Sequence, residues 1–421
     1  MMIRTYIQQK WSHLTRKVQA AVAMPVAIIA AAILLTGSCT IEPPLELVDR
    51  TSNGNIELNK VSLDLKVLWS YDLTYDWQAE WYYDWDIQDE TIFGSWDIAE
   101  PKVFNIRRYF TGENPYAPHT SVLADMVYGS RFESRYKYGY YDILVWNDVN
   151  TIDGVQSLHF DETSTLEYVV AYTNQSNQPT HAPHKVPEYS QSYAPGYAFY
   201  QPEFLFAGDY EDLHVSDNPD DYDSLIVETN TWYKYVPLHL TPVTYIYLPQ
   251  IILHHNDGKI TDVDGSGNLT GMARSVNLLT HITSEDAISV NHNVRMKRHI
   301  LIDPDKTGTQ EDVDIVGGRV FTFGLTGVNP NAITRSNSTH AQMMRSDIQN
   351  YLEVKFHFKN GTDSTIVWDV TDKVKERYKG GVITLHIDCD KIPLPDNHKG
   401  GGSGFDATVK DFDEETYEIP M

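Results

Sequence analysis

Apolar and polar residues alternate along much of the chain. Between residues 61 and 67, Val61, Leu63 and Leu65 alternate with Ser62 and Asp64, which places one face of a strand in a core and the other in water. Similar short runs, rich in Val, Ile, Tyr, Phe and Thr, occur at residues 102–109, 140–146, 166–172, 243–253, 320–325, 352–358, 364–370 and 382–387. The pattern predicts strands of antiparallel sheets.

Turn-forming sequences separate several of these runs, and helical patterns are sparse. Asn, Asp, Lys and Gly residues mark turns at 256–258, 359–361 and 379–381. Residues 340–349 and 374–378 are each predicted to make one or two helical turns. The fold class is therefore all-β, with two β-sandwich domains.

The domain organisation follows from repeats in the strand pattern. A strand series opens at residue 243 much as one opens at residue 61, and a glycine-led strand follows in each half, at 139–146 and 318–325. We expect an N-terminal domain at 39–236 and a C-terminal domain at 237–421. A strand-poor, Pro-rich stretch at 174–196 is predicted to be a surface excursion or linker.

Cys39 closes an N-terminal export signal. Basic residues and no acids precede an apolar run of about 16 residues, which is short for a transmembrane helix of about 20. The small residues Gly37 and Ser38 then lead to Cys39, so residues 1–38 are predicted to be a lipoprotein signal peptide and Cys39 the lipidation site. Thr36 stands where such signals usually carry leucine. An uncleaved anchor and an ordinary secreted protein are the alternatives.

The charge of the mature chain excludes some partners. Removing residues 1–38 takes away four basic and no acidic residues, which leaves 29 Lys and Arg against 58 Asp and Glu, a net charge of −29. Such a chain repels phosphate backbones, so nucleic-acid binding is excluded. The chain has two cysteines, and lipidation of Cys39 leaves Cys389 unpaired. No disulfide framework is expected.

Four segments, taken in order, resemble one group of proteins: residues 140–147, 269–273, 367–372 and the glycine-rich 400–405. Over most of residues 39–421 the chain resembles Bacteroidota lipoproteins allied to the fimbrillins and fimbrial anchor subunits. The resemblance implies two transthyretin/immunoglobulin-like β-sandwich domains, export to the outer membrane, and a part in surface fimbriae or adhesion.

Aromatic residues gather at residues 69–96, which hold five of the nine tryptophans together with tyrosines and acids. Exposed aromatic planes beside carboxylates stack on sugar rings, so Trp77, Trp81 and Trp85 are candidate glycan contacts. The alternative is that these rings pack in a core or an interface and cap one end of a sandwich, where their four-residue spacing would place them on one side of a short helix.

Patterns for metal binding and catalysis are weak. Residues 262–270 match the first nine positions of a calcium loop, but Ala273 stands where a glutamate should complete the shell, and a polar hairpin running into a strand is the plainer interpretation. The remaining candidates, His181, His184, His254, His255, His292 and His299, look scattered. No nucleophile motif is present. We therefore predict no metal, no cofactor and no enzymatic activity.

These observations lead to one functional prediction and one alternative. The chain is predicted to be a non-enzymatic lipoprotein on the outer membrane, at the cell surface, serving as a fimbrial anchor, accessory subunit or adhesin. Its partners would be the membrane, through the lipid, and fimbrial subunits, through strand addition at residues 408–419 or at the strand near Val61. The alternative is a surface lipoprotein that binds glycans through residues 69–96.

Overall fold

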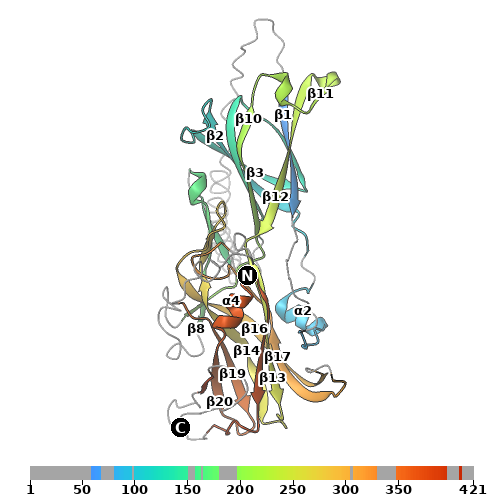
Figure 1. Cartoon of the computed structure of the whole chain (residues 1–421), viewed down its shortest axis with the longest axis vertical. Coiled ribbons are helices and arrows are strands. Elements are labelled where there is room, and N and C mark those ends of the chain that lie inside the picture. Colours follow the sequence, from blue (N-terminus) through green and yellow to red (C-terminus); the bar gives the residue numbers. More distant parts are fainter. Residues whose placement is uncertain are drawn as a thin grey trace, which may run out of the picture. The chain divides into compact units, whose positions relative to one another are not determined.

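The computed structural model describes residues 58–67, 80–96, 99–149, 157–162, 165–179, 197–303, 307–329, 348–395 and 407–409. Strands dominate these residues, and the all-β fold class is confirmed (Figure 1). Most predicted runs are strands within a few residues of their expected ends, because alternation of apolar and polar side chains is what a half-buried strand requires.

The first sheet folds into two layers around a core. Its order is β3-β2-β5-β10-β12-β1-β4, with β11 beside β12. The strands are β1 (Leu58–Val67), β2 (Val103–Gly112), β3 (Ser121–Tyr128), β4 (Arg131–Arg135), β5 (Gly139–Asn147), β10 (Phe206–Val215), β11 (Ser224–Ile226) and β12 (Thr231–Pro242). Apolar residues of β1 and β12 pack with those of β2, β5 and β10 in one cluster, as in a β-sandwich.

β1 has neighbours on both sides. It pairs with β12 in parallel over its whole length, from Leu58 to Val67, and with β4 in antiparallel fashion from Lys60 to Asp64. The prediction that the strand near Val61 is a free edge was therefore wrong. Alternation shows which residues face the core, but the lateral neighbours of a strand depend on segments far along the chain.

The second sheet is larger, with the order β18-β13-β17-β16-β14-β19-β20-β22. It comprises β13 (Tyr245–His254), β14 (Ile260–Ala273), β16 (Ala287–Ile302), β17 (Glu311–Gly318), β18 (Val320–Thr322), β19 (Tyr351–Phe358), β20 (Asp363–Asp369) and β22 (Ala407–Val409), with β21 (Gly381–Asp388) beside β13. Its core joins residues of β13, β14, β16, β19, β20 and β21. A short helix is present near the predicted 374–378, but it begins three residues and ends two residues earlier, as α4 (Thr371–Glu376). The helix predicted at 340–349 lies outside the described residues except for 348 and 349, which are not helical.

A small third sheet contains β6 (Leu158–Asp161), β7 (Val170–Thr173) and β15 (Ser275–Asn277). The strand predicted at 166–172 was only half right, because Leu166–Tyr168 is a 3-10 turn that precedes β7. Leu166, Val169 and Ala171 all enter one apolar cluster. Two core contacts spaced three residues apart suit a turn better than a strand.

Two strands from the predicted excursion at 174–196 and its border join the second sheet. β8 (Gln175–Pro179) pairs with β9 (Tyr197–Phe199), and β9 pairs with β16. Residue 236, where the domains were predicted to divide, lies within β12, and the described chain leaves the first sheet for the last time between Pro242 and Tyr245. The division into 39–236 and 237–421 stays a prediction.

Candidate functional site

Two of the predicted site residues lie outside the described residues. These are Cys39, with the whole signal segment 1–38, and Trp77. Within the part of the chain that the structure describes, no helix has both the length and the apolar character needed to cross a membrane. Because Cys39 lies outside the described residues, its lipidation stays a prediction from the sequence.

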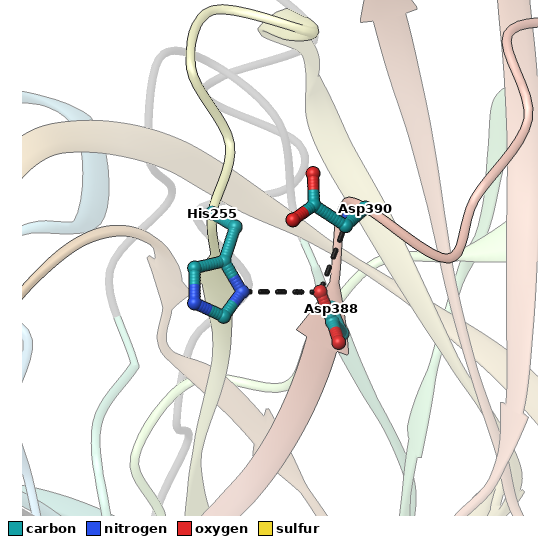
Figure 2. Close-up of side chains that lie close together, drawn as sticks. All are labelled: His255, Asp388 and Asp390. Carbon is teal, nitrogen blue, oxygen red and sulfur yellow. Dashed lines mark hydrogen bonds and ion pairs between the residues drawn. The ribbon is translucent and has the colours of Figure 1, made fainter.

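Two histidines that looked scattered in the sequence lie in polar clusters at the ends of β13 and β21. His255 Nδ1 lies 3.2 Å from Asp388 Oδ1, and the Asp390 N–H donates to the same Asp388 oxygen at 3.2 Å (Figure 2). Beside them, His254 contacts Glu311 through Nδ1 at 2.8 Å and His386 through Nε2 at 2.9 Å. Sequence reasoning missed these clusters, although the alternating His386, Asp388 and Asp390 were visible in it.

The pKa values of the first cluster reflect its ion pair. The hydrogen bond to Asp388 raises the pKa of His255, and burial only partly opposes it. For Asp388, desolvation raises the pKa, but hydrogen bonds from His255 and Lys391 outweigh this and lower it overall. At neutral pH the carboxylate of Asp388 is therefore ionised and oriented toward the imidazole.

The calcium-like segment at residues 262–270 lies within β14. An extended strand paired with β16 and β19 is not the tight loop that wraps a calcium ion. The strand is irregular near Gly265, which has φ of 75°. The interpretation as polar sequence running into a strand accounts for this segment.

Trp81 and Trp85 belong to residues 80–96, which pack on the face of β13, β16 and β17 that is turned away from the second core. We call residues 80–96 the docked segment. Trp81, Tyr82 and Trp85 surround a cluster that includes buried Tyr83 and Phe93. The predicted helix carrying Trp81 and Trp85 was wrong, since α2 (Ile87–Phe93) begins only after both residues.

Asp86 sets where α2 begins. Its carboxylate accepts the N–H groups of Gln88 and Asp89, and the Asp89 carboxylate accepts the Asp86 N–H at 2.7 Å. This reciprocal arrangement is a capping box, which satisfies N–H groups that a helix otherwise leaves unpaired. Asp86 itself has extended backbone angles (φ −123°, ψ 178°), so α2 begins after it and does not include Trp85.

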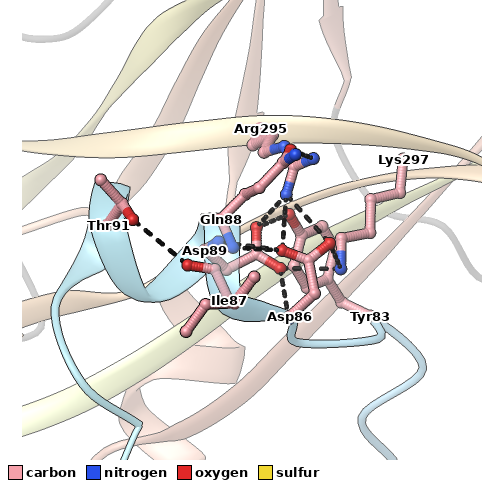
Figure 3. Close-up of polar contacts among 8 residues, drawn as sticks. All are labelled: Tyr83, Asp86, Ile87, Gln88, Asp89, Thr91, Arg295 and Lys297. Atoms are coloured by element: carbon pink, nitrogen blue, oxygen red, sulfur yellow. Dashed lines mark hydrogen bonds and ion pairs between the residues drawn. The ribbon is translucent and has the colours of Figure 1, made fainter.

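The two capping carboxylates also hold the docked segment on β16. Arg295 lies 2.8 Å from Asp89 and 3.1 Å from Asp86, and Lys297 lies 2.7 Å and 3.0 Å from the same two carboxylates (Figure 3). The Tyr83 hydroxyl donates to Asp89 at 2.7 Å. Asp89 is fully buried, and its oxygens accept from four donors, which offsets the cost of burying the charge.

These contacts lower the pKa values of both aspartates. Desolvation acts in the opposite direction, but hydrogen bonds from Lys297 and from backbone N–H groups outweigh it for Asp86 and Asp89 alike. For Tyr83, burial and then the bond to Asp89 raise the pKa. The carboxylates stay ionised and the phenol stays protonated through the neutral range, so the network keeps its charges.

Hydrogen bonds to the second sheet hold both ends of the docked segment. Gln250 accepts the Tyr82 N–H at 2.9 Å and donates to the Glu80 carbonyl. At the other end, Arg319 donates to the carbonyls of Ser95 and Phe93. The segment is thus an integral part of the fold, joined to the second sheet by hydrogen bonds at each end.

The tryptophan rings of the docked segment pack against other side chains of the same chain. Trp85 lies 4.9 Å from both Phe93 and Trp96 between ring centroids, and Arg319 sits over its ring at 5.4 Å. The Nε1 atoms of Trp81 and Trp85 are buried, where they cannot donate to a sugar hydroxyl. Core packing, the alternative to glycan contact, describes these two rings, and glycan binding through Trp77, Trp81 and Trp85 stays a prediction.

β3 forms one end of the first sheet, and among the described strands it pairs only with β2. The Gly129 N–H donates to the Lys102 carbonyl, and the Asp148 N–H donates to the Val103 carbonyl. Even-numbered residues of β2 therefore bond to β3 and odd-numbered ones to β5. The peptide groups of the even-numbered residues of β3 consequently point away from the sheet.

Large apolar side chains accompany these outward peptide groups. Met126 is 55% exposed and Tyr128 is 80% exposed. Among the described strands, β22, at the start of the predicted edge segment 408–419, also pairs with one strand alone, β20. Natural edge strands are usually protected by charges, prolines or bulges, so an apolar edge such as β3 marks a surface suited to pairing with another chain.

Comparisons with known proteins give structural likeness alone. No protein-family model matches the chain, and no curated protein matches its sequence. Among solved structures, the chain is similar to a candidate adhesin from Bacteroides ovatus (14% identity, TM-score 0.42), with 80% of this chain and 94% of that chain covered. It is also similar to the fimbrial anchor protein Mfa2 from Porphyromonas gingivalis (11% identity, TM-score 0.39), with 78% and 90% covered.

A third similar structure is a fimbrial assembly protein from Parabacteroides distasonis (10% identity, TM-score 0.27), with 78% of this chain and 90% of that chain covered. These structural neighbours are proteins of the kind that the sequence resembles. Because the TM-scores are below 0.5 and the identities below 25%, the likeness carries no conclusion about what this chain binds.

Proposed function

We propose that this chain is an outer-membrane lipoprotein of the cell surface, anchored by lipid on Cys39, that acts without catalysis as a fimbrial anchor, accessory subunit or adhesin. The anchor is supported by the basic, apolar and small-residue pattern before Cys39. The acidic surface suits an exported protein that binds neither nucleic acid nor anionic lipid headgroups. The assembly role is supported by the sheet edges.

The outer edge of β3, which pairs with no other described strand, is the observation that carries the assembly role. Each backbone hydrogen bond added by an incoming strand contributes about 1 kcal/mol net. Met126 and Tyr128 would add apolar stabilisation of about 25 cal/mol for each Å² of their exposed apolar surface that the incoming strand covers. A fimbrial subunit that supplies one extended segment would therefore find affinity in the backbone and selectivity in these two side chains.

Proline at Ala124 tests this edge without disturbing the sheet. Ala124 is exposed, and its N–H points away from β2, so Ala124→Pro removes a group that only an incoming strand would use. Ala124→Val keeps that N–H and is the matched control. We expect Ala124→Pro to lose co-purification of fimbrial subunits from the producing cells, while Ala124→Val retains it. Equal recovery from both variants would refute strand addition at β3.

Substitution of the lipidated cysteine tests the anchor separately. Cys39→Ser removes the sulfur that would carry the lipid, so we expect the variant to lose labelling by a palmitate analogue and to leave the membrane fraction. Cys389→Ser, which changes a buried thiol, serves as the control and should keep both properties. Membrane retention of Cys39→Ser together with an intact N-terminus would show an uncleaved anchor instead.

A further inference from the structure

We propose that His255, Asp388 and Asp390 form a binding site for a divalent transition-metal ion of the zinc class. One ligand atom from each residue lies within 4.8 Å of the other two. Two ligands about 2.1 Å from a tetrahedral zinc ion lie about 3.4 Å apart. The 3.2 Å between His255 Nδ1 and Asp388 Oδ1 is close to that separation.

Asp390 supplies the third ligand from the turn after β21. Figure 2 shows its side chain on the same side of the strands as the ring of His255. One of its carboxylate oxygens lies within 4.8 Å of the ligand atoms of His255 and Asp388, and the side chain is exposed, so it has room to change rotamer toward a shared ion. The three residues thus provide one nitrogen and two oxygens around a single point.

Parallel pairing of β13 with β21 brings these residues together. His254, the last residue of β13, is opposite Asp388, the last residue of β21, so both strands end at the same edge. His255 and Asp390 follow directly in the two turns beyond. The arrangement depends on a pairing between segments 133 residues apart.

The polar cluster of His254, His386 and Glu311 fixes the end of β13 that precedes His255. The rings of His254 and His386 stack at 5.2 Å between centroids, and Glu311 of β17 holds the other nitrogen of His254. Three strands are therefore joined by side-chain bonds directly beside the proposed site. Because these bonds hold the strand end in place, they limit the motion of the adjacent ligand His255, and a less mobile ligand favours metal binding.

Another histidine with two nearby aspartates shows a different geometry. His357 contacts Asp363 through Nδ1 at 2.7 Å and Asp264 through Nε2 at 3.7 Å, so its two nitrogens face two different carboxylates. Lys355 lies 3.3 Å from Asp363 and 3.6 Å from Asp264. A cation already occupies the space between those carboxylates, and the ligand atoms do not converge. Among the described residues, only the His255 group converges in this way.

The ligand set selects the class of ion. One imidazole with two carboxylates suits zinc and similar divalent ions, whereas calcium takes six or more oxygen ligands. Three protein ligands leave the fourth tetrahedral position to water or to a group from a partner. Lys391, whose side chain is 60% exposed, lies 3.3 Å from Asp388 Oδ2 and gives up that contact when the ion binds.

Calorimetric titration of zinc into the full chain in detergent, without a histidine tag, tests the site. We expect one tight equivalent of zinc and no comparable binding of calcium or magnesium. His255→Asn, which tolerates the positive φ of 51° at this position, should abolish that equivalent, and Asp390→Asn should weaken it at least tenfold. Thermal melting without metal verifies that each variant is folded.

His299→Asn is the matched control. His299 also has a positive φ, of 57°, and its Nδ1 also lies 3.2 Å from a carboxylate, that of Asp312, but no further ligand from a described residue converges on the pair. We expect this variant to bind zinc as the unchanged chain does. If His255→Asn leaves the tight equivalent unchanged, or if His299→Asn removes it as well, the proposed site is wrong.

Discussion

Asp89 is the side chain on which attachment of the docked segment, residues 80–96, depends most. Its buried carboxylate accepts the Tyr83 hydroxyl, the Asp86 N–H and the charged groups of Arg295 and Lys297 at 2.7–2.8 Å. Asp89→Ala removes all four acceptor contacts at once. We expect the segment to open from β16 far more often in this variant.

The expected loss of stability in Asp89→Ala depends on the contacts that the buried cations and the Tyr83 hydroxyl keep. Removing one partner of a buried ion pair costs about 3–5 kcal/mol, and an unpaired buried hydroxyl such as that of Tyr83 costs about 1–3 kcal/mol. Asp86 still lies near both cations, but its side chain is 41% exposed, so it compensates only in part. We take about 3 kcal/mol, which corresponds to about a hundredfold increase in the opening equilibrium.

Hydrogen–deuterium exchange followed by mass spectrometry measures this opening directly. Peptides covering residues 80–96 should exchange about a hundredfold faster in Asp89→Ala, while peptides of β2 and β5 keep their rates. Glu90→Ala, at an exposed position on the same helix, is the control and should change stability by less than about 0.5 kcal/mol. An increase of less than tenfold at residues 80–96, or equal increases throughout the chain, would refute the reasoning.

Three further predictions concern neighbouring features. A Cβ at Gly317 would overlap the ring of Tyr83, so Gly317→Ala should loosen the docked segment in the same exchange assay, and the effect should shrink in a Tyr83→Ala background. The pKa values of Asp86 and Asp89 are lowered in the fold, so their stabilisation is complete above an unfolded pKa of about 3.9 and declines as the pH falls below it. Tryptophan fluorescence between pH 6 and pH 2 should record this loss, and an unchanged signal would contradict it. Burial raises the pKa of Cys389 to about 12, so a maleimide should label this thiol at pH 7 only after unfolding in guanidinium, and rapid labelling of the folded chain would contradict its burial.

The local pattern of the sequence determined most of the strands. Runs such as 102–109 and 352–358 form β2 and β19 because alternating side chains decide locally which face of a strand is buried. The turn at 256–258 could also be predicted from the local sequence, since Asp257 and Gly258 adopt the positive φ values that such residues favour. The helix expected around Trp81 failed because a capping aspartate, Asp86, outweighed the spacing of the aromatic residues.

Neighbours across the sheets were decided only by the tertiary structure. The sequence placed Val61 in a strand, but the pairing of β1 with both β12 and β4 removed it from the edge and left β3 exposed instead. His255 and Asp388 meet through the pairing of β13 with β21, and Asp89 meets Arg295 across more than 200 residues. Alternation fixes the side of a strand that each residue occupies. Which distant segment lies beside that strand depends on the packing of the whole core, so the sequence pattern alone could not reveal these sites.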